Sequence, residues 1–508
     1  MNGPATLTWF ARHELTLAWR DWAAMMAGGR TTRERAVTFG ALIFVGLLHW
    51  LAFAILSPVM TAQILSNKQT LVSVTATLLL TFTMMLSQAI EQVTRAFYAR
   101  SDLDLILSSP ASSQHLFAVR ISSIALTGAL MTCLMAAPFI NMAAYLSGAG
   151  WLAAYGVVAA MSMFATGIAV MGAIALFKAF GPKRTRLIAQ IVAAVVGASL
   201  LIGLQVAAIM AYGNLSRYEV LKSSKLVQSA PDAASLFWLP AHAVLGEPLA
   251  VLALTLAGAG FLAAVIATYA HLFSSYAVAA AGVSEHSEAR GGTHRPFRTL
   301  TTAQALRAKE WLLLKRDPWL ASQTLMQILY LVPPALLLWR DMGAKANVHV
   351  IIAPVLVMAF GQLSGGLAWL AISGEDAPDL VATAPLLRRA ILRAKTEAVL
   401  MAISLVALPL VVGLAFVSVG GAIATAAGIA AASISAIVIQ LWFRVVATRS
   451  QFRRRQMASK ASTFAEAFSS IFWAGSAGFA AMGSLFAIPF VALALVTLAA
   501  AWMIRPRV

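Results

Sequence analysis

The residues of this chain that could do chemistry are few, and its acidic residues lie outside the middle of its apolar segments. The 508 residues include 19 Asp and Glu. Glu91, Glu397 and Glu466 come closest, and each lies at the end of an apolar run. A proton-coupled or ion-coupled transporter usually needs an ionisable relay within the membrane. This scarcity of acids argues against a secondary transporter.

Two histidines, His49 and His271, do lie within apolar segments. We interpret both as packed or interface-facing side chains rather than as proton carriers. Uncharged polar residues in or near the apolar segments are better candidates for lining a transport pathway, and we single out Asn141, Gln205 and Gln362.

The sequence lacks the common signatures of catalysis and cofactor binding. It contains no Gly-x-x-x-x-Gly-Lys-Ser/Thr phosphate loop, so the chain is not expected to hold ATP phosphates in that way. Its single cysteine, Cys133, excludes disulfides and cysteine-based metal frameworks. The spacing of His286 and His294, in a polar stretch, fits no compact metal site. We therefore expect neither a cofactor nor enzymatic activity in this chain.

Composition indicates the fold class. Hydrophobic residues make up 60% of the chain and charged residues 11%, against roughly 25% charged in soluble domains, and the mean hydropathy is +0.82. A helix of about 20 apolar residues crosses the hydrocarbon core of a membrane. The sequence thus predicts an all-α, polytopic membrane protein with twelve transmembrane helices. The predicted spans are 37–60, 69–91, 120–146, 151–177, 187–213, 250–275, 320–340, 349–373, 396–418, 420–443, 464–483 and 484–504.

The basic residues predict the orientation of these spans. With the N-terminus inside, the external loops contain only six of the 37 Lys and Arg residues, namely Lys68, Arg217, Lys222, Lys225, Arg340 and Lys345. Short loops rich in Lys and Arg stay cytoplasmic, so both termini are predicted on the cytoplasmic side of a bacterial inner membrane. We attribute the net charge of +18 to this orientation and to anionic lipid headgroups rather than to nucleic acid.

The chain also repeats itself. The segment DLILSSP at 104–110 matches DLVATAP at 379–385, an offset of 275 residues. Six predicted spans separate the two copies, which indicates two parallel six-helix halves. The first half covers 1–276, a polar cytoplasmic linker covers 277–302, and the second half covers 303–508.

A short polar helix is predicted before the first span of each half. Residues 7–26 form an amphipathic pattern that is too polar to span and suits the cytoplasmic interface, with tryptophans at the level of the headgroups. A copy of this pattern at 303–317 precedes the seventh span. The matching residues of the two interfacial helices are Trp19, Arg20 and Asp21 in the first half and Lys315, Arg316 and Asp317 in the second.

The repeated acidic segments lie between spans two and three and between spans eight and nine. In the first copy, Ser101 can cap a short helix whose acidic residues complement the helix dipole, and Pro110 can begin the next helix. A basic residue, Arg120 or Lys395, stands ten residues beyond each repeated proline. Each copy predicts a short cytoplasmic helix, a sharp turn and entry into the next span, with a solvated turn as the alternative.

This layout resembles the membrane subunits of ATP-binding-cassette exporters of the ABC-2 type, twice over essentially the whole chain. In that family the segment between spans two and three is a coupling helix that docks in a cleft of the ATPase. The resemblance implies docking by Asp102, Asp104, Ser109 and Pro110 in the first half and by Asp376, Asp379 and Pro385 in the second.

The second copy departs from the family pattern, because Ala377-Pro378 interrupts it and Ala384 replaces Ser109. Equal coupling by the two halves is therefore not implied. The resemblance implies an exporter permease that docks two copies of a separate cytoplasmic ATPase subunit. The near absence of charge within the spans favours a hydrophobic or amphipathic substrate. The alternatives are an ion-coupled transporter or lipid flippase without an ATPase, and a membrane-embedded transferase or protease.

Overall fold

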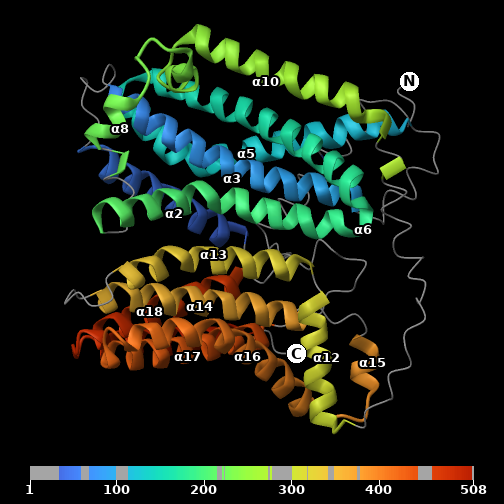
Figure 1. Ribbon diagram of the computed structural model, residues 1–508, viewed down its shortest axis with the longest axis vertical. Coiled ribbons are helices and arrows are strands. Elements are labelled where there is room, and N and C mark those ends of the chain that lie inside the picture. The colour runs from blue at the N-terminus through green and yellow to red at the C-terminus, as the bar shows by residue number, and fades with distance from the viewer. Residues whose placement is uncertain are drawn as a thin grey trace. The chain divides into compact units, whose positions relative to one another are not determined.

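The computed structural model shows an all-α protein, and its described residues form helices and turns without any β-strand (Figure 1). Each of the twelve predicted spans is helical over most of its length. The all-α fold class is thereby confirmed. The described residues are Thr16, 34–58, 68–98, 112–213, 220–221, 223–272, 275–276, 300–316, 318–340, 348–373, 378–443 and 460–505.

Several helices match the thickness of a membrane. Within the described ranges, eight helices are long and apolar enough to cross a bilayer, as judged by length and composition, and two shorter apolar helices cover Val45–Leu56 and Ala487–Met503. The chain is therefore a multi-pass membrane protein by these criteria. The eight helices are Lys68–Tyr98, Gln114–Ser147, Ala149–Pro182, Arg184–Tyr212, Pro248–Leu272, His349–Ile372, Arg389–Ala415 and Val419–Trp442.

Two of the predicted spans, 151–177 and 187–213, form the two arms of α6 (Ala154–Tyr212), which are separate membrane-length helices joined at a sharp break. The kink lies at Gly181, whose φ of 68° and ψ of 169° are not helical, and Pro182 follows it. A positive φ is readily adopted by glycine, and a proline removes a helical hydrogen bond, so this pair of residues explains the break. The hydroxyl of Tyr98 donates to the carbonyl oxygen of Pro182 at 2.5 Å, which ties the kink to α3.

The chain divides into two compact units, which comprise 1–201 with 217–288 and 202–216 with 289–508. In the first unit, the buried core lies among α3, α5, α6 and α10. Its helices are α2 (Glu34–Leu56), α3 (Lys68–Tyr98), α5 (Ser113–Ser147), η3 (Ala149–Ala153), most of α6, α8 (Ser224–Ser229), η4 (Leu236–Trp238), α9 (Leu239–Val244), α10 (Pro248–Tyr269) and η5 (Ala270–Leu272).

Part of the long loop predicted at 214–249 is folded against the first unit. The side chain of Trp238 is buried in a small apolar cluster with Leu71 and Val72, at the start of α3, and with Ala241 of α9. The indole Nε1 of Trp238 donates to the carbonyl oxygen of Asp232 at 3.0 Å, so its polar atom is satisfied. A single tryptophan thereby fixes this segment to the end of a spanning helix.

The second unit begins with a helix that does not run along its bundle. In Figure 1, α12 crosses the ends of α13, α14 and α16, and its closest packing is against α16. The helices of this unit are the last turns of α6, α12 (Thr302–Arg316), α13 (Pro318–Arg340), α14 (Val348–Ser373), α15 (Pro378–Thr383), α16 (Arg388–Ala415), α17 (Val419–Trp442), α18 (Lys460–Ala481) and α19 (Ala487–Ile504).

The helices α14, α17 and α18 pack more closely on one another than any other trio among the described elements. Glycines make this possible: a Cβ added at Gly428 of α17 would lie 2.7 Å from the side chain of Val357 and 2.9 Å from that of Ala477. Small residues allow helix backbones to approach closely in a membrane. We call this three-helix contact the α14–α17–α18 seam.

Candidate functional site

The interfacial helix predicted at 303–317 is α12, and it is held on the bundle by one apolar and one charged side chain. Leu306 and Glu310 are buried on the side that meets the bundle, whereas Leu312 is exposed on another side. Residues four apart lie on the same face of a helix, so Leu306 and Glu310 form a single contact strip. The position of α12 therefore depends on the group that pairs with the buried Glu310 carboxylate.

The Glu310 carboxylate forms an ion pair with Lys395 of α16. The ammonium Nζ of Lys395 lies 2.9 Å from Oε1 and 3.0 Å from Oε2 of Glu310, and the side chains are 10% and 1% exposed. Nζ also donates to the backbone carbonyl oxygen of Ala371, near the end of α14, at 2.6 Å. Lys309 places a second ammonium 3.5 Å from Oε1. One lysine thus connects three helices, and we call this group the Lys395 junction.

The Lys395 junction brackets the predicted coupling segment of the second half. Ala371 precedes the segment 374–387, and Lys395 follows it, so their hydrogen bond joins the two ends of that segment. Because Glu310 is bonded to the same nitrogen, α12 is attached to both ends as well. Lys395 thereby links α12 to the two helices, α14 and α16, that flank the segment.

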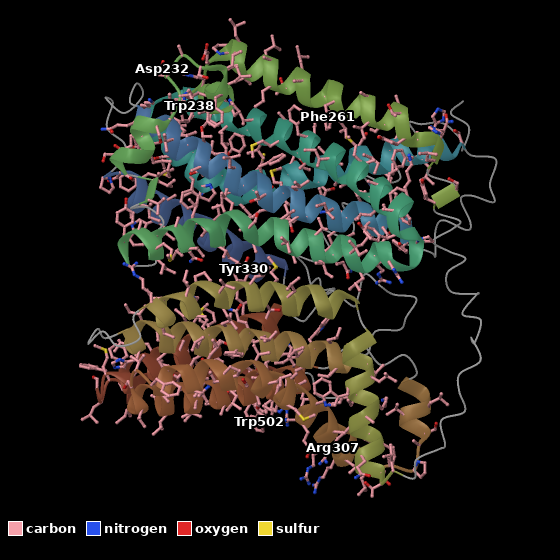
Figure 2. The ribbon with its side chains drawn as sticks, viewed as in Figure 1. Asp232, Trp238, Phe261, Arg307, Tyr330 and Trp502 are labelled. Carbon is pink, nitrogen blue, oxygen red and sulfur yellow. The ribbon has the colours of Figure 1, made fainter. Side chains whose placement is uncertain are left out.

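A second, exposed ion pair lies beside the junction. The guanidinium of Arg307 donates to a carboxylate oxygen of Glu397 at 2.5 Å, and Arg393 donates to the other oxygen at 2.8 Å. Arg307 projects from α12 on the side of α16 (Figure 2). The hydrogen bond and the charge of Glu397 hold the pKa of Arg307 above its ordinary value. Exposed pairs contribute little to stability, so the buried junction is the principal anchor of α12.

The segment itself contains a helix and a sharp turn, as the sequence predicts. Its helix is α15, which begins at Pro378. A proline is tolerated at the first position of a helix. The backbone then turns at Ala384 and Pro385 and enters α16 through Leu387.

This turn presents apolar side chains to the surroundings. Leu380 is 72% exposed and Leu387 is 80% exposed, and Pro385 between them is also exposed. Asp379 is the second residue of α15. The sequence analysis missed the two leucines, although the repeat contained a signal: Leu380 aligns with Leu105 at the same offset of 275 residues.

The other predicted docking and interfacial residues are placed only in part. Lys315 and Arg316 belong to the last turn of α12. The residues that lie outside the described ones are Asp102, Asp104, Ser109, Pro110 and Asp376 of the predicted docking set, and Trp19, Arg20, Asp21 and Asp317 of the interfacial helices.

The candidate pathway residue Asn141 lies in a hydrogen-bonded chain across three helices. Tyr155 of α6 donates to Oδ1 of Asn141 at 2.8 Å, and Nδ2 of Asn141 lies 3.2 Å from Nε2 of His49 in α2. The other ring nitrogen of His49 lies 2.8 Å from the carbonyl oxygen of Val45, which assigns its hydrogen to Nδ1. The interpretation of His49 as a packed histidine agrees with these contacts.

The remaining pathway candidates, Gln205 and Gln362, are partly buried in the second unit, whereas Asn141 belongs to the first. Within the first unit, α3, α5 and α6 enclose a cavity of about 10 Å³ whose polar lining is Gln88, Gln92, Ser162 and Thr166. Such a cavity has room for about one water molecule. It is too small to be a substrate site.

Neither a family model, a curated protein nor a solved structure matches this chain. Its function is therefore inferred from its own residues and their geometry.

Proposed function

We propose that this chain is the membrane-spanning permease subunit of an ATP-binding-cassette exporter of the ABC-2 type. It moves a hydrophobic or amphipathic substrate across the bacterial inner membrane, and two copies of a separate cytoplasmic ATPase subunit supply the energy. The proposal includes twelve transmembrane helices in two parallel six-helix halves, with both termini in the cytoplasm. The Lys395 junction is the observation that carries it.

A coupling segment must satisfy two physical requirements. It needs an exposed surface that the ATPase can bind, and it needs a stiff connection to the helices that the ATPase must move. The segment 378–387 offers Leu380, Pro385 and Leu387 as the surface. The bond from Lys395 to Ala371, shared with Glu310, supplies the connection.

The mechanism that follows is a population shift. Closure of the ATPase dimer on ATP displaces the docked segment, and α12, α14 and α16 move with it because Lys395 joins them. ATP changes the equilibrium only through contacts that differ between the two states of the permease. The chain itself contains no phosphate loop, so nucleotide binding and hydrolysis belong to the partner.

The test is co-purification with an ATPase. The chain, tagged and extracted from its native membrane in mild detergent, is expected to retain a protein that contains a phosphate loop and hydrolyses ATP. Leu387→Asp, alone or with Leu380→Asp, is expected to release that ATPase, since a charge is placed in the contact. Leu300→Asp, at an exposed leucine outside the segment, is the matched control and is expected to retain it.

Two results would contradict the proposal. One is equal ATPase retention by the wild-type chain and the Leu380→Asp/Leu387→Asp variant. The other is substrate transport by the purified chain in vesicles without any ATPase, which would favour an ion-coupled transporter or flippase instead.

A further inference from the structure

Two glutamates of the second unit are inserted between helices, and their surroundings differ in charge. Glu310 faces the ammonium of Lys395 and is therefore compensated. Glu466 lies in the second turn of α18, in the α14–α17–α18 seam. Its one hydrogen bond among the described residues comes from an uncharged amide, the side chain of Gln440.

The side chain of Glu466 is half-buried, and its carboxyl group points between the helices. Nε2 of Gln440, at the end of α17, lies 2.7 Å from Oε2. The other oxygen, Oε1, occupies the space that Gly365 of α14 leaves free, since a Cβ added at Gly365 would lie 1.6 Å from it. The glycine therefore leaves the room that the carboxyl group occupies between the helices.

The neighbouring polar groups are uncharged hydroxyls. Ser469 and Ser470 follow Glu466 by three and four residues, which places them on the same face of α18. Both are 1% exposed, and their hydroxyl groups have no hydrogen-bond partner among the described residues. Ser470 faces Gly361, one helical turn along α14 from Gly365. Among the described side chains, the polar groups of the seam here include no counter-charge.

The titratable groups on the surrounding helices do not compensate Glu466. In α14, α17 and α19, which pack against α18, the described residues include one titratable side chain, His349, which lies 16 residues from Gly365, about 24 Å along α14. Arg505, just after α19, lies over the ring of Trp502. Lys460, the other charged residue of α18, has its side chain outside the described part.

An ionised carboxylate withdrawn from water without a cation is strongly disfavoured, and it takes up a proton instead. We propose that Glu466 is a proton-binding site: its carboxyl group is protonated while α14, α17 and α18 are packed as described, and it releases the proton to water when α14 separates from α18. The same helix α14 contributes Ala371, six residues from Gly365, to the Lys395 junction. Proton binding at Glu466 therefore responds to the position of α14, whatever force moves that helix.

Infrared spectroscopy of the whole chain in lipid vesicles tests the protonation directly. The wild-type spectrum is expected to contain the carbonyl band of a protonated carboxylic acid at neutral pH. Glu466→Gln, which keeps the shape and removes the acid, is expected to lose that band. Glu310→Gln is the matched control and is expected to retain it, because the Glu310 carboxylate is paired with the ammonium of Lys395.

A carbodiimide provides a second, residue-specific measurement in the wild-type chain. The oxygen of a protonated carboxyl group adds to the central carbon of dicyclohexylcarbodiimide while its proton moves to a nitrogen, and an acyl shift then gives a stable N-acylurea. Mass spectrometry is expected to find this adduct on Glu466 but not on Glu310 or Glu397. Gly365→Ala, which displaces the carboxyl from the seam, is expected to reduce the modification several-fold.

If the wild-type and Glu466→Gln spectra show the same carbonyl absorption of protonated acids, the proposal is overturned, because Glu466 would then be ionised in the wild-type chain. Modification of Glu310 and Glu397 to the same extent as Glu466 would also overturn it. Neither measurement involves an ATPase, so either outcome leaves the permease assignment to be decided by co-purification alone.

Discussion

Removal of the charge at Lys395 is the most direct perturbation of the junction that anchors α12. In Lys395→Met the methionine keeps most of the side-chain volume, and the Glu310 carboxylate, 1% exposed, loses the ammonium at 2.9 Å. Breaking a buried ion pair by removing one partner costs about 3–5 kcal/mol. Lys309, with its ammonium 3.5 Å from Oε1, offsets part of this loss. We therefore expect a cost near the lower limit, about 3 kcal/mol.

The expected effect is local, because α12 is attached at the edge of the second unit. Hydrogen exchange of the α12 amides, followed by mass spectrometry, measures the free energy of its local opening. A loss of about 3 kcal/mol corresponds to exchange that is roughly a hundredfold faster. Peptides from α17, which is packed in the seam, are expected to exchange as in the wild-type chain. Glu310→Gln/Lys395→Met, which buries no charge at the junction, is expected to recover much of the protection.

The matched control is Arg393→Ala. Arg393 bonds Glu397 on the same stretch of α16, but its side chain is 79% exposed. Exposed pairs four residues apart contribute about 0.3–0.5 kcal/mol, so exchange in α12 is expected to change by a factor of about two. Equal protection of α12 in Lys395→Met and in Arg393→Ala would refute the idea that the Lys395 junction holds this helix.

Three further predictions follow from the sequence and the proposed function. The purified chain is expected to bind no ATP, since it lacks a phosphate loop, and saturable nucleotide binding by the folded chain in a filtration assay would contradict this. In a Cys133→Ala background, a cysteine at Ser287 is expected to escape an impermeant thiol reagent added outside intact cells, because the linker is predicted to be cytoplasmic; labelling would reverse the topology. Charge reversal at Asp102 and Asp104 is expected to weaken ATPase co-purification tenfold or more without affecting membrane insertion, and unchanged retention would favour solvated turns.

The fold was largely predictable from the sequence, because apolar segments of membrane-spanning length can satisfy their backbone only as helices. The helix expected at 303–317 is likewise observed as α12, and its place at the membrane interface stays a prediction. The division between spans 151–177 and 187–213 was also predictable, since the basic residues near Gly181 indicated a connection, and Gly181 and Pro182 break the helix at that place. The number of twelve spans stays a prediction.

The contacts of the candidate site were less predictable, for a physical reason. The repeat singled out Lys395 as a basic residue ten positions after a repeated proline. Its partner, Glu310, lies 85 positions away in the sequence, so the repeat could not predict the ion pair. Sequence periodicity reports which face of a helix is apolar, and it does not report which residue of another helix meets that face. The surroundings of Glu466 were unpredictable for the same reason, because its described neighbours come from three helices, α14, α17 and α18.

The polar character of α18 has a consequence for how the protein is made. This helix is not among those that could cross a membrane by length and composition alone, and it contains Glu466, Ser469 and Ser470. Insertion of a segment during synthesis depends on its own apolarity, so α18 is a poor substrate for entering lipid by itself. The surfaces of α14 and α17, which are made earlier, can accept its polar face. Insertion of α18 therefore requires that α14 and α17 already lie in the membrane. The sequence meets this requirement, because both helices precede α18.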